Sequence, residues 1–156
     1  MKIKTLEDLL TDELKDLYSA ENQITKALPK MARTTRSREL RSAFEEHLRQ
    51  TENQVTRLEK VCDELGISPK GKKCVGMEGL LEEGKEIMSN GADPSALEAG
   101  LIGAAHNVEH SEIAAYGTAS AHARQLGFNS VVQLLDQTLE AEKMTAEKFT
   151  KIAENK

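Results

Sequence analysis

The stretch HNVEHSEIAAYGTA, residues 106–119, places acidic side chains on what should be the buried face of a long helix. Steps of four and three residues define that face, and its members are Leu101, Ala105, Val108, Glu112, Ala115 and Ala119. An overlapping line adds Glu109 and Tyr116. Because an unpaired buried carboxylate costs several kcal/mol or is neutralised by a proton, Glu112 lies either in a frayed region or opposite a cation.

The composition favours one helical domain spanning residues 1–156. Charged residues make up 30% of the chain and aromatic residues only 3%, as in many helical bundles. The net charge of −5 argues against a protein that binds nucleic acid through bulk electrostatics.

The sequence also points away from membranes and towards a reducing compartment. No apolar run approaches the roughly 20 residues of a membrane span. Cys62 and Cys74 form no C-x-x-C pair, so free thiols are expected. We therefore expect a soluble cytoplasmic protein with no membrane partner.

The same spacing predicts a first helical hairpin. Thr5 and Asp8 resemble a capping box, and the helix behind them reaches Met31, with Pro29 expected to kink or end it within residues 26–31. After a turn at residues 34–37, a second helix begins at the Ser37 cap and stops at Gly66.

A second hairpin follows a long connection. Asp93 and Pro94 begin a helix that extends to about Leu126, and a last helix opens at Asn129 or Ser130. The connection, residues 66–93, contains a short helix from about Met77 to Met88. Its length lets the third long helix run parallel to the second, which predicts an all-α four-helix bundle with a crossover.

Each long helix carries a polar residue within its apolar face: Glu21, His47, Glu112 and Glu142. Axial rise is about 1.5 Å per residue, so Glu21 lies level with Gln50 and within about one turn of His47 in an antiparallel pair. By the same count, Glu112 lies within one turn of Glu142. If the two hairpins share one register, these groups converge on a central layer.

Carboxylates and histidine from facing helices are the ligands of di-iron and di-manganese bundles. Such sites usually contain Glu-x-x-His motifs, and this chain has none. The second helix has His47-x-x-Gln50 instead, and the third has Glu109-x-x-Glu112. The arrangement of these residues matches such a metal site, but the chain offers fewer ligands than these sites usually have.

Several segments resemble the YciF/YciE-like family of bacterial stress proteins. They are YSAE at residues 18–21, FEEHL at 44–48, MEGLLEE at 77–83, VEHSEIAAYGT at 108–118 and TLEAEK at 138–143. The resemblance covers nearly the whole chain. It implies a ferritin-like fold related to rubrerythrin, a homodimer, and a role under oxidative, osmotic or bile-type stress.

The resemblance also implies a dinuclear iron or manganese centre that handles peroxide or oxygen. Its metal ligands would be Glu21, His47, Glu109, Glu112 and Glu142. Relatives often have Glu where this chain has Gln50, and a Glu-Glu pair where it has Ala141 and Glu142. Of these five residues, Glu109 has a second possible orientation, in which its side chain faces the flank of its helix and not the bundle interior.

Other polar residues have simpler expected roles. Thr51 and Gln54 would hydrogen-bond to metal ligands, and buried Tyr18 or Tyr116 would pack with a bonded hydroxyl. His106, His110 and His122 are expected at solvent or a subunit interface. Cys74 lies in a lysine-rich loop that could lower its pKa, but it has no partner base for catalysis.

Three functions fit this pattern. One is an enzyme that consumes peroxide or oxygen, with catalytic residues that the sequence does not identify. Another is a protein that sequesters metal without turnover, and a third is a metal-free helical scaffold acting through protein interactions. Storage of many ions would need a large shell-forming assembly, for which the sequence gives no sign.

Overall fold

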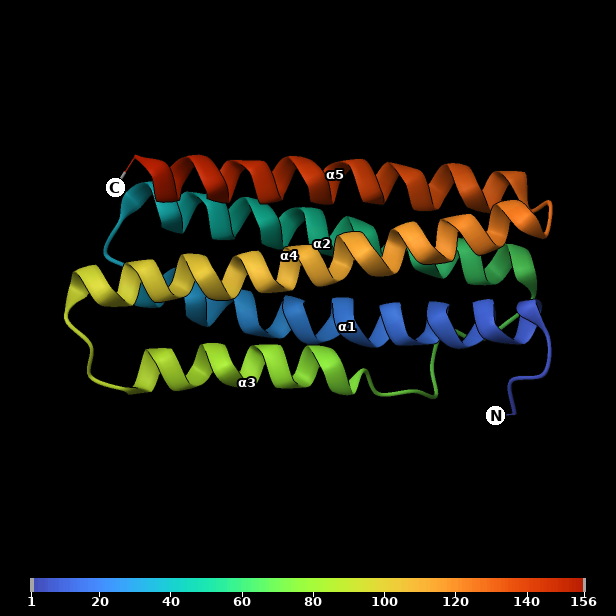
Figure 1. Cartoon of the computed structure of the whole chain (residues 1–156), viewed down its shortest axis with the longest axis horizontal. Coiled ribbons are helices and arrows are strands. Elements are labelled where there is room, and N and C mark those ends of the chain that lie inside the picture. Colours follow the sequence, from blue (N-terminus) through green and yellow to red (C-terminus); the bar gives the residue numbers. More distant parts are fainter. Residues whose placement is uncertain (1, 156) are drawn as a thin grey trace.

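The computed structural model describes residues 2–155, and within that range all regular structure is helical. The helices are α1 (Leu6–Thr34), α2 (Arg38–Leu65), α3 (Val75–Ser89), α4 (Pro94–Gln125) and α5 (Asn129–Glu154) (Figure 1). The predicted all-α class, the four long helices and the short helix in the connection are confirmed. No helix in the described range is long and apolar enough to cross a membrane.

The four long helices form a bundle in which α1 and α2 are one antiparallel hairpin and α4 and α5 are the other (Figure 1). The hairpins join because α1 packs beside α4 and α2 beside α5, which leaves α2 and α4 on a diagonal. These diagonal helices run in the same direction, as the long connection predicted. Helix α3 packs outside the bundle against α1 and α4.

The helix ends follow the predicted local signals. Thr5 and Asp8 form a capping box at the start of α1, and the Ser37 hydroxyl accepts a hydrogen bond from the Leu40 N–H. Asp93 caps α4 in the same way, with Pro94 at the first helical position. Gly66 ends α2 in the left-handed conformation, with φ of 68°.

Helix α1 does not end within residues 26–31, so that alternative of the prediction is wrong. It continues through Pro29 to Thr34. Met31 and Ala32, beyond the proline, are buried in the core. Their packing stabilises the last turn and offsets the hydrogen bond that Pro29 cannot donate to the turn before it, so tertiary contact overrides the local signal.

Two apolar clusters fill the bundle. One contains Ile24, Leu28, Phe44 and Phe149 and extends to Met77 of α3. The other contains Leu10, Leu14, Leu58 and Leu135 near the opposite end. In each long helix, the predicted metal ligands lie between residues of one cluster and residues of the other. The candidate site is therefore enclosed by apolar side chains at both ends.

A buried hydrogen-bonded link joins the two hairpins near the α1–α2 turn. The Thr35 hydroxyl donates to both carboxylate oxygens of Glu98, at 2.5 and 2.6 Å, and the Arg36 N–H donates to Oε1 at 3.0 Å. Glu98 belongs to the first turns of α4. The link therefore fixes the turn of the first hairpin against the start of the second.

Candidate metal centre

All five residues predicted as metal ligands lie inside the bundle. Helix α1 supplies Glu21, α2 supplies His47, α4 supplies Glu109 and Glu112, and α5 supplies Glu142. None is more than 3% exposed. Because each of these residues interrupts the apolar face of its helix, packing that face inward carries the polar group with it.

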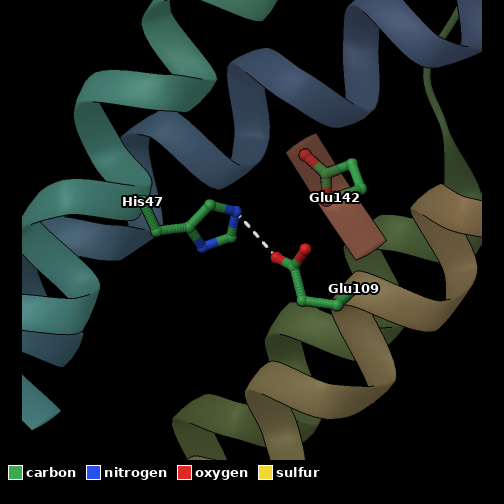
Figure 2. Close-up of side chains that lie close together, drawn as sticks. All are labelled: His47, Glu109 and Glu142. Carbon is green, nitrogen blue, oxygen red and sulfur yellow. Dashed lines mark ion pairs between the residues drawn. The ribbon is translucent and has the colours of Figure 1, made fainter. Parts of the chain in front are cut away.

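The five side chains form two overlapping groups of three. His47, Glu109 and Glu142 make one group, and Glu21, Glu112 and Glu142 make the other. In each group, one ligating atom per residue lies within 4.8 Å of those of the other two. Figure 2 shows the first group converging from α2, α4 and α5. Glu142 belongs to both groups, so the two positions are adjacent.

Only a few of the polar atoms in this layer have partners in the described structure. His47 Nε2 lies 2.7 Å from Glu109 Oε1, and the Tyr116 hydroxyl donates to Glu21 Oε2 at 2.9 Å. The buried atoms without a hydrogen bond include Glu21 Oε1, His47 Nδ1 and both carboxylate oxygens of Glu112 and of Glu142. Oxygen and imidazole atoms left unpaired in a dry core are suitable ligands for a divalent cation.

The pKa values of the acidic groups reflect this burial. The pKa of Glu21 and the pKa of Glu109 are each raised to about 7, and burial is the main cause in both cases. The pKa values of Glu112 and Glu142 lie well above their usual range, again because of burial first. Repulsion from Glu21 comes second for Glu112, and hydrogen bonding with Glu109 comes second for Glu142. Burial lowers the pKa of His47, so its imidazole is favoured as the neutral form that ligates metal.

The structure places Glu109 in the central layer, not on the flank of α4. Its side chain is fully buried and faces His47 across the bundle (Figure 2). The flank alternative is therefore wrong. Glu109 and Glu112 are one turn apart, and the packing of α4 against both α1 and α5 buries a face wide enough to include both.

Gln54, which the sequence predicted beside the metal ligands, is buried near Glu142. It is 1% exposed, and neither its amide oxygen nor its amide nitrogen has a hydrogen-bond partner among the described residues. Its amide is nevertheless one of the influences that lower the raised pKa of Glu142, so the two side chains lie near each other. Its place two turns after His47, on the same helix face, predicted this position.

Two neighbours of Gln54 point elsewhere. The Thr51 hydroxyl donates to the His47 backbone carbonyl at 2.7 Å, so it supports the helix and not a ligand side chain. Gln50 is half-buried, and its amide oxygen accepts from the Thr145 hydroxyl at 2.8 Å.

The remaining histidines lie away from this layer. His110 is exposed, as predicted. His106 is half-buried with Nε2 3.1 Å from the Thr150 hydroxyl, and His122 Nδ1 lies 2.8 Å from Glu13 Oε1. His106 and His122 therefore have partners within their own chain.

The tyrosines and Cys74 can be assigned as well. The Tyr116 phenol is fully buried against Glu21, whereas the Tyr18 hydroxyl bonds to Glu59 at 3.3 Å.

Cys74 is buried and caps α3, and burial raises the pKa of its thiol. The suggested lowering of that pKa is therefore wrong, since desolvation outweighs the nearby Lys72.

An antiparallel bundle with a long crossover and a central layer of carboxylates and imidazole defines a ferritin-like protein. More specifically, the chain belongs to the family DUF892, a domain of unknown function, whose model matches residues 5–156.

Relatives of known structure agree with this assignment. The chain is 45% identical to protein YciF of Escherichia coli K12, covering 99% of this chain and 94% of that protein. It superposes on the crystal structure of that stress protein with a TM-score of 0.95, covering 98% of this chain and 97% of the other. YcfI from Rhodopseudomonas palustris is 42% identical, with a TM-score of 0.93 and coverage of 96% and 95%.

Proposed function

We propose that this protein acts in the bacterial stress response and binds a dinuclear iron or manganese centre that reacts with peroxide or oxygen. The observation that carries the proposal is the pair of buried ligand groups sharing Glu142. The description of the E. coli relative as a stress protein supports the physiological part.

The charge of the layer suits two divalent ions. Glu21, Glu109, Glu112 and Glu142 provide four negative charges when ionised, and two divalent cations would balance them. His47 adds a neutral nitrogen donor. When bound, iron or manganese would supply the change of redox state that reduction of peroxide or oxygen requires.

The side chains of this protein would hold and shield such a centre. The Tyr116 hydroxyl fixes one oxygen of Glu21, which limits rotation of that carboxylate. The apolar clusters at both ends exclude water, so electrostatic interactions inside the layer are strong. In the metal-free protein, burial raises the pKa values of Glu21 and Glu109, so bound cations would displace protons from these carboxyl groups.

The test is peroxide consumption by protein loaded with Mn²⁺ or Fe²⁺ and freed of unbound metal. We expect loss of peroxide above the chelated control, and loss of that activity in Glu142→Gln. Glu140→Gln is the matched control, because Glu140 is 70% exposed on the same helix. Metal-loaded protein that consumes no peroxide or oxygen would overturn the catalytic proposal.

Stoichiometric binding without turnover would instead indicate metal sequestration. The metal-free scaffold remains the second candidate because the layer already contains two linking contacts, His47 with Glu109 and Tyr116 with Glu21. In a scaffold these contacts would specify helix pairing. Absence of bound metal from protein purified without chelator and then offered iron or manganese would favour it.

We also propose that the protein is a cytoplasmic homodimer that associates through α4. The exposed residues of α4 between Ala99 and Ala121 include no Asp, Glu, Lys or Arg, although 30% of the chain is charged. Depletion of charge is typical of interface cores. Light scattering should report a dimer that Ala114→Lys dissociates and that Met144→Lys, on the exposed face of α5, leaves intact.

A further inference from the structure

The two ligand groups in the central layer are chemically different. His47, Glu109 and Glu142 offer one nitrogen and carboxylate oxygens, whereas Glu21, Glu112 and Glu142 offer carboxylate oxygens only. Imidazole favours Fe²⁺, Co²⁺ and Zn²⁺ over hard ions such as Mg²⁺, which prefer oxygen. The two positions therefore differ in the ions that they prefer and in the strength with which they bind them.

Charge balance distinguishes the positions further. One divalent ion beside His47 is neutralised by Glu109 and Glu142 together. A second ion then finds Glu142 already engaged, and depends on Glu21 and Glu112 for its charge balance. It also experiences repulsion from the first ion, because the shared carboxylate places the two positions next to each other.

Hydrogen bonding leaves the all-carboxylate position with fewer free oxygens. The Tyr116 hydroxyl occupies Oε2 of Glu21, which leaves Oε1 as the oxygen of this carboxylate that is free for an ion.

We propose that the centre fills in order: the first ion binds His47, Glu109 and Glu142, and a second, weaker ion then binds Glu21 and Glu112 with Glu142 shared. This inference rests on the proposed dinuclear site and adds its order of occupation. At limiting metal the protein would hold one ion per chain, at the histidine position.

Titration of metal-free full-length protein with Co²⁺ tests the order by calorimetry and by the visible spectrum, which reports nitrogen ligation. We expect two steps separated by about tenfold or more in dissociation constant. Glu21→Gln should remove the second step and keep the first. His47→Gln should weaken the first step by about tenfold or more and change its spectrum.

The controls are exposed residues of the same types. His110→Gln lies on α4 and Glu140→Gln on α5, and both should leave the two steps unchanged. Circular dichroism of each variant establishes that it is folded. Glu21→Gln keeps the shape of the side chain, so the order can be tested even if His47→Gln does not fold.

Two Co²⁺ ions binding with one affinity, or a first step that survives His47→Gln and disappears in Glu21→Gln, would overturn the order while leaving a dinuclear site intact. No Co²⁺ binding at all would overturn the proposed function itself. The two failures are therefore distinguishable.

Discussion

His47 Nε2 lies 2.7 Å from Glu109 Oε1, and this contact joins α2 to α4 across the diagonal of the bundle. Diagonal helices are held apart by the side chains between them, so such a contact requires long polar side chains that reach the bundle axis. Both residues are buried, and Glu142 approaches them from α5 (Figure 2). The bundle axis at this level is thus polar, between two apolar clusters.

The stability of metal-free protein should fall as pH rises. Burial raises the folded-state pKa of Glu21 and of Glu109 from 4.5 to about 7, so the folded protein retains protons that the unfolded chain releases. This contribution is fully present below the unfolded pKa of 4.5 and is lost as pH rises through about 7. Thermal melts in excess chelator, from about pH 5 to about pH 8, measure it.

Added metal should reverse this pH dependence. Ions bind ionised carboxylates, so metal affinity rises with pH as protons are displaced. The gain in melting temperature on adding Mn²⁺ should therefore be larger at the alkaline end of the series. Metal-free melting temperatures that climb through the same interval would contradict the raised pKa values.

Glu112→Leu should stabilise the metal-free protein and reduce its stabilisation by metal, because the second metal position loses a ligand while His47, Glu109 and Glu142 still hold one ion. Leu removes a buried acidic group that has no hydrogen-bond donor and keeps a similar volume, a change worth about 1–4 kcal/mol in comparable buried sites. Denaturant unfolding with chelator and with Mn²⁺ separates the two effects. If Glu112→Leu retains full stabilisation by Mn²⁺, this carboxylate is not a ligand.

Tyr116→Phe should cost about 1–2 kcal/mol in free energy of unfolding, because it removes the buried hydroxyl that donates to Glu21. Tyr18→Phe is the matched control: its hydroxyl bonds to Glu59 at a longer 3.3 Å near the surface, so its loss should change little. Equal effects of the two substitutions in urea unfolding would show that the Glu21 bond contributes nothing specific.

Two glycines of α4 should respond in opposite ways to alanine. A Cβ at Gly103 meets nothing within 4 Å, so Gly103→Ala should gain up to about 1 kcal/mol from helix propensity. A Cβ at Gly100 would lie 2.7 Å from Ile87 Cγ2 in α3, so Gly100→Ala should lose stability or displace α3. Urea unfolding compares them, and a gain at Gly100 would contradict this packing of α3 on α4.

Periodicity predicted the long helices because their apolar faces are strict and their caps use standard residues. Thr5, Ser37, Asp93 and Gly66 all act as their types suggest. The helix end predicted from Pro29 was wrong, because the burial of Met31 and Ala32 depends on partners that lie far away in the sequence.

The candidate site was predictable to the extent that its residues interrupt apolar faces. Glu21, His47, Glu112 and Glu142 do so individually, and axial heights placed them in two pairs. The register between hairpins was not predictable, because it depends on tertiary contacts such as that between Thr35 and Glu98. The orientation of Gln54 depends on the same packing.

Metal content measured on Glu142→Gln beside the unaltered protein tests the central claim most directly. Both proteins are loaded with Mn²⁺ or Fe²⁺, freed of unbound metal and examined by elemental analysis. Glu142 belongs to both ligand groups, so its loss affects both metal positions. We therefore expect two ions per chain in the unaltered protein and almost no bound metal in the variant. Equal metal content in the two proteins, or none in either, would contradict a metal centre in this layer.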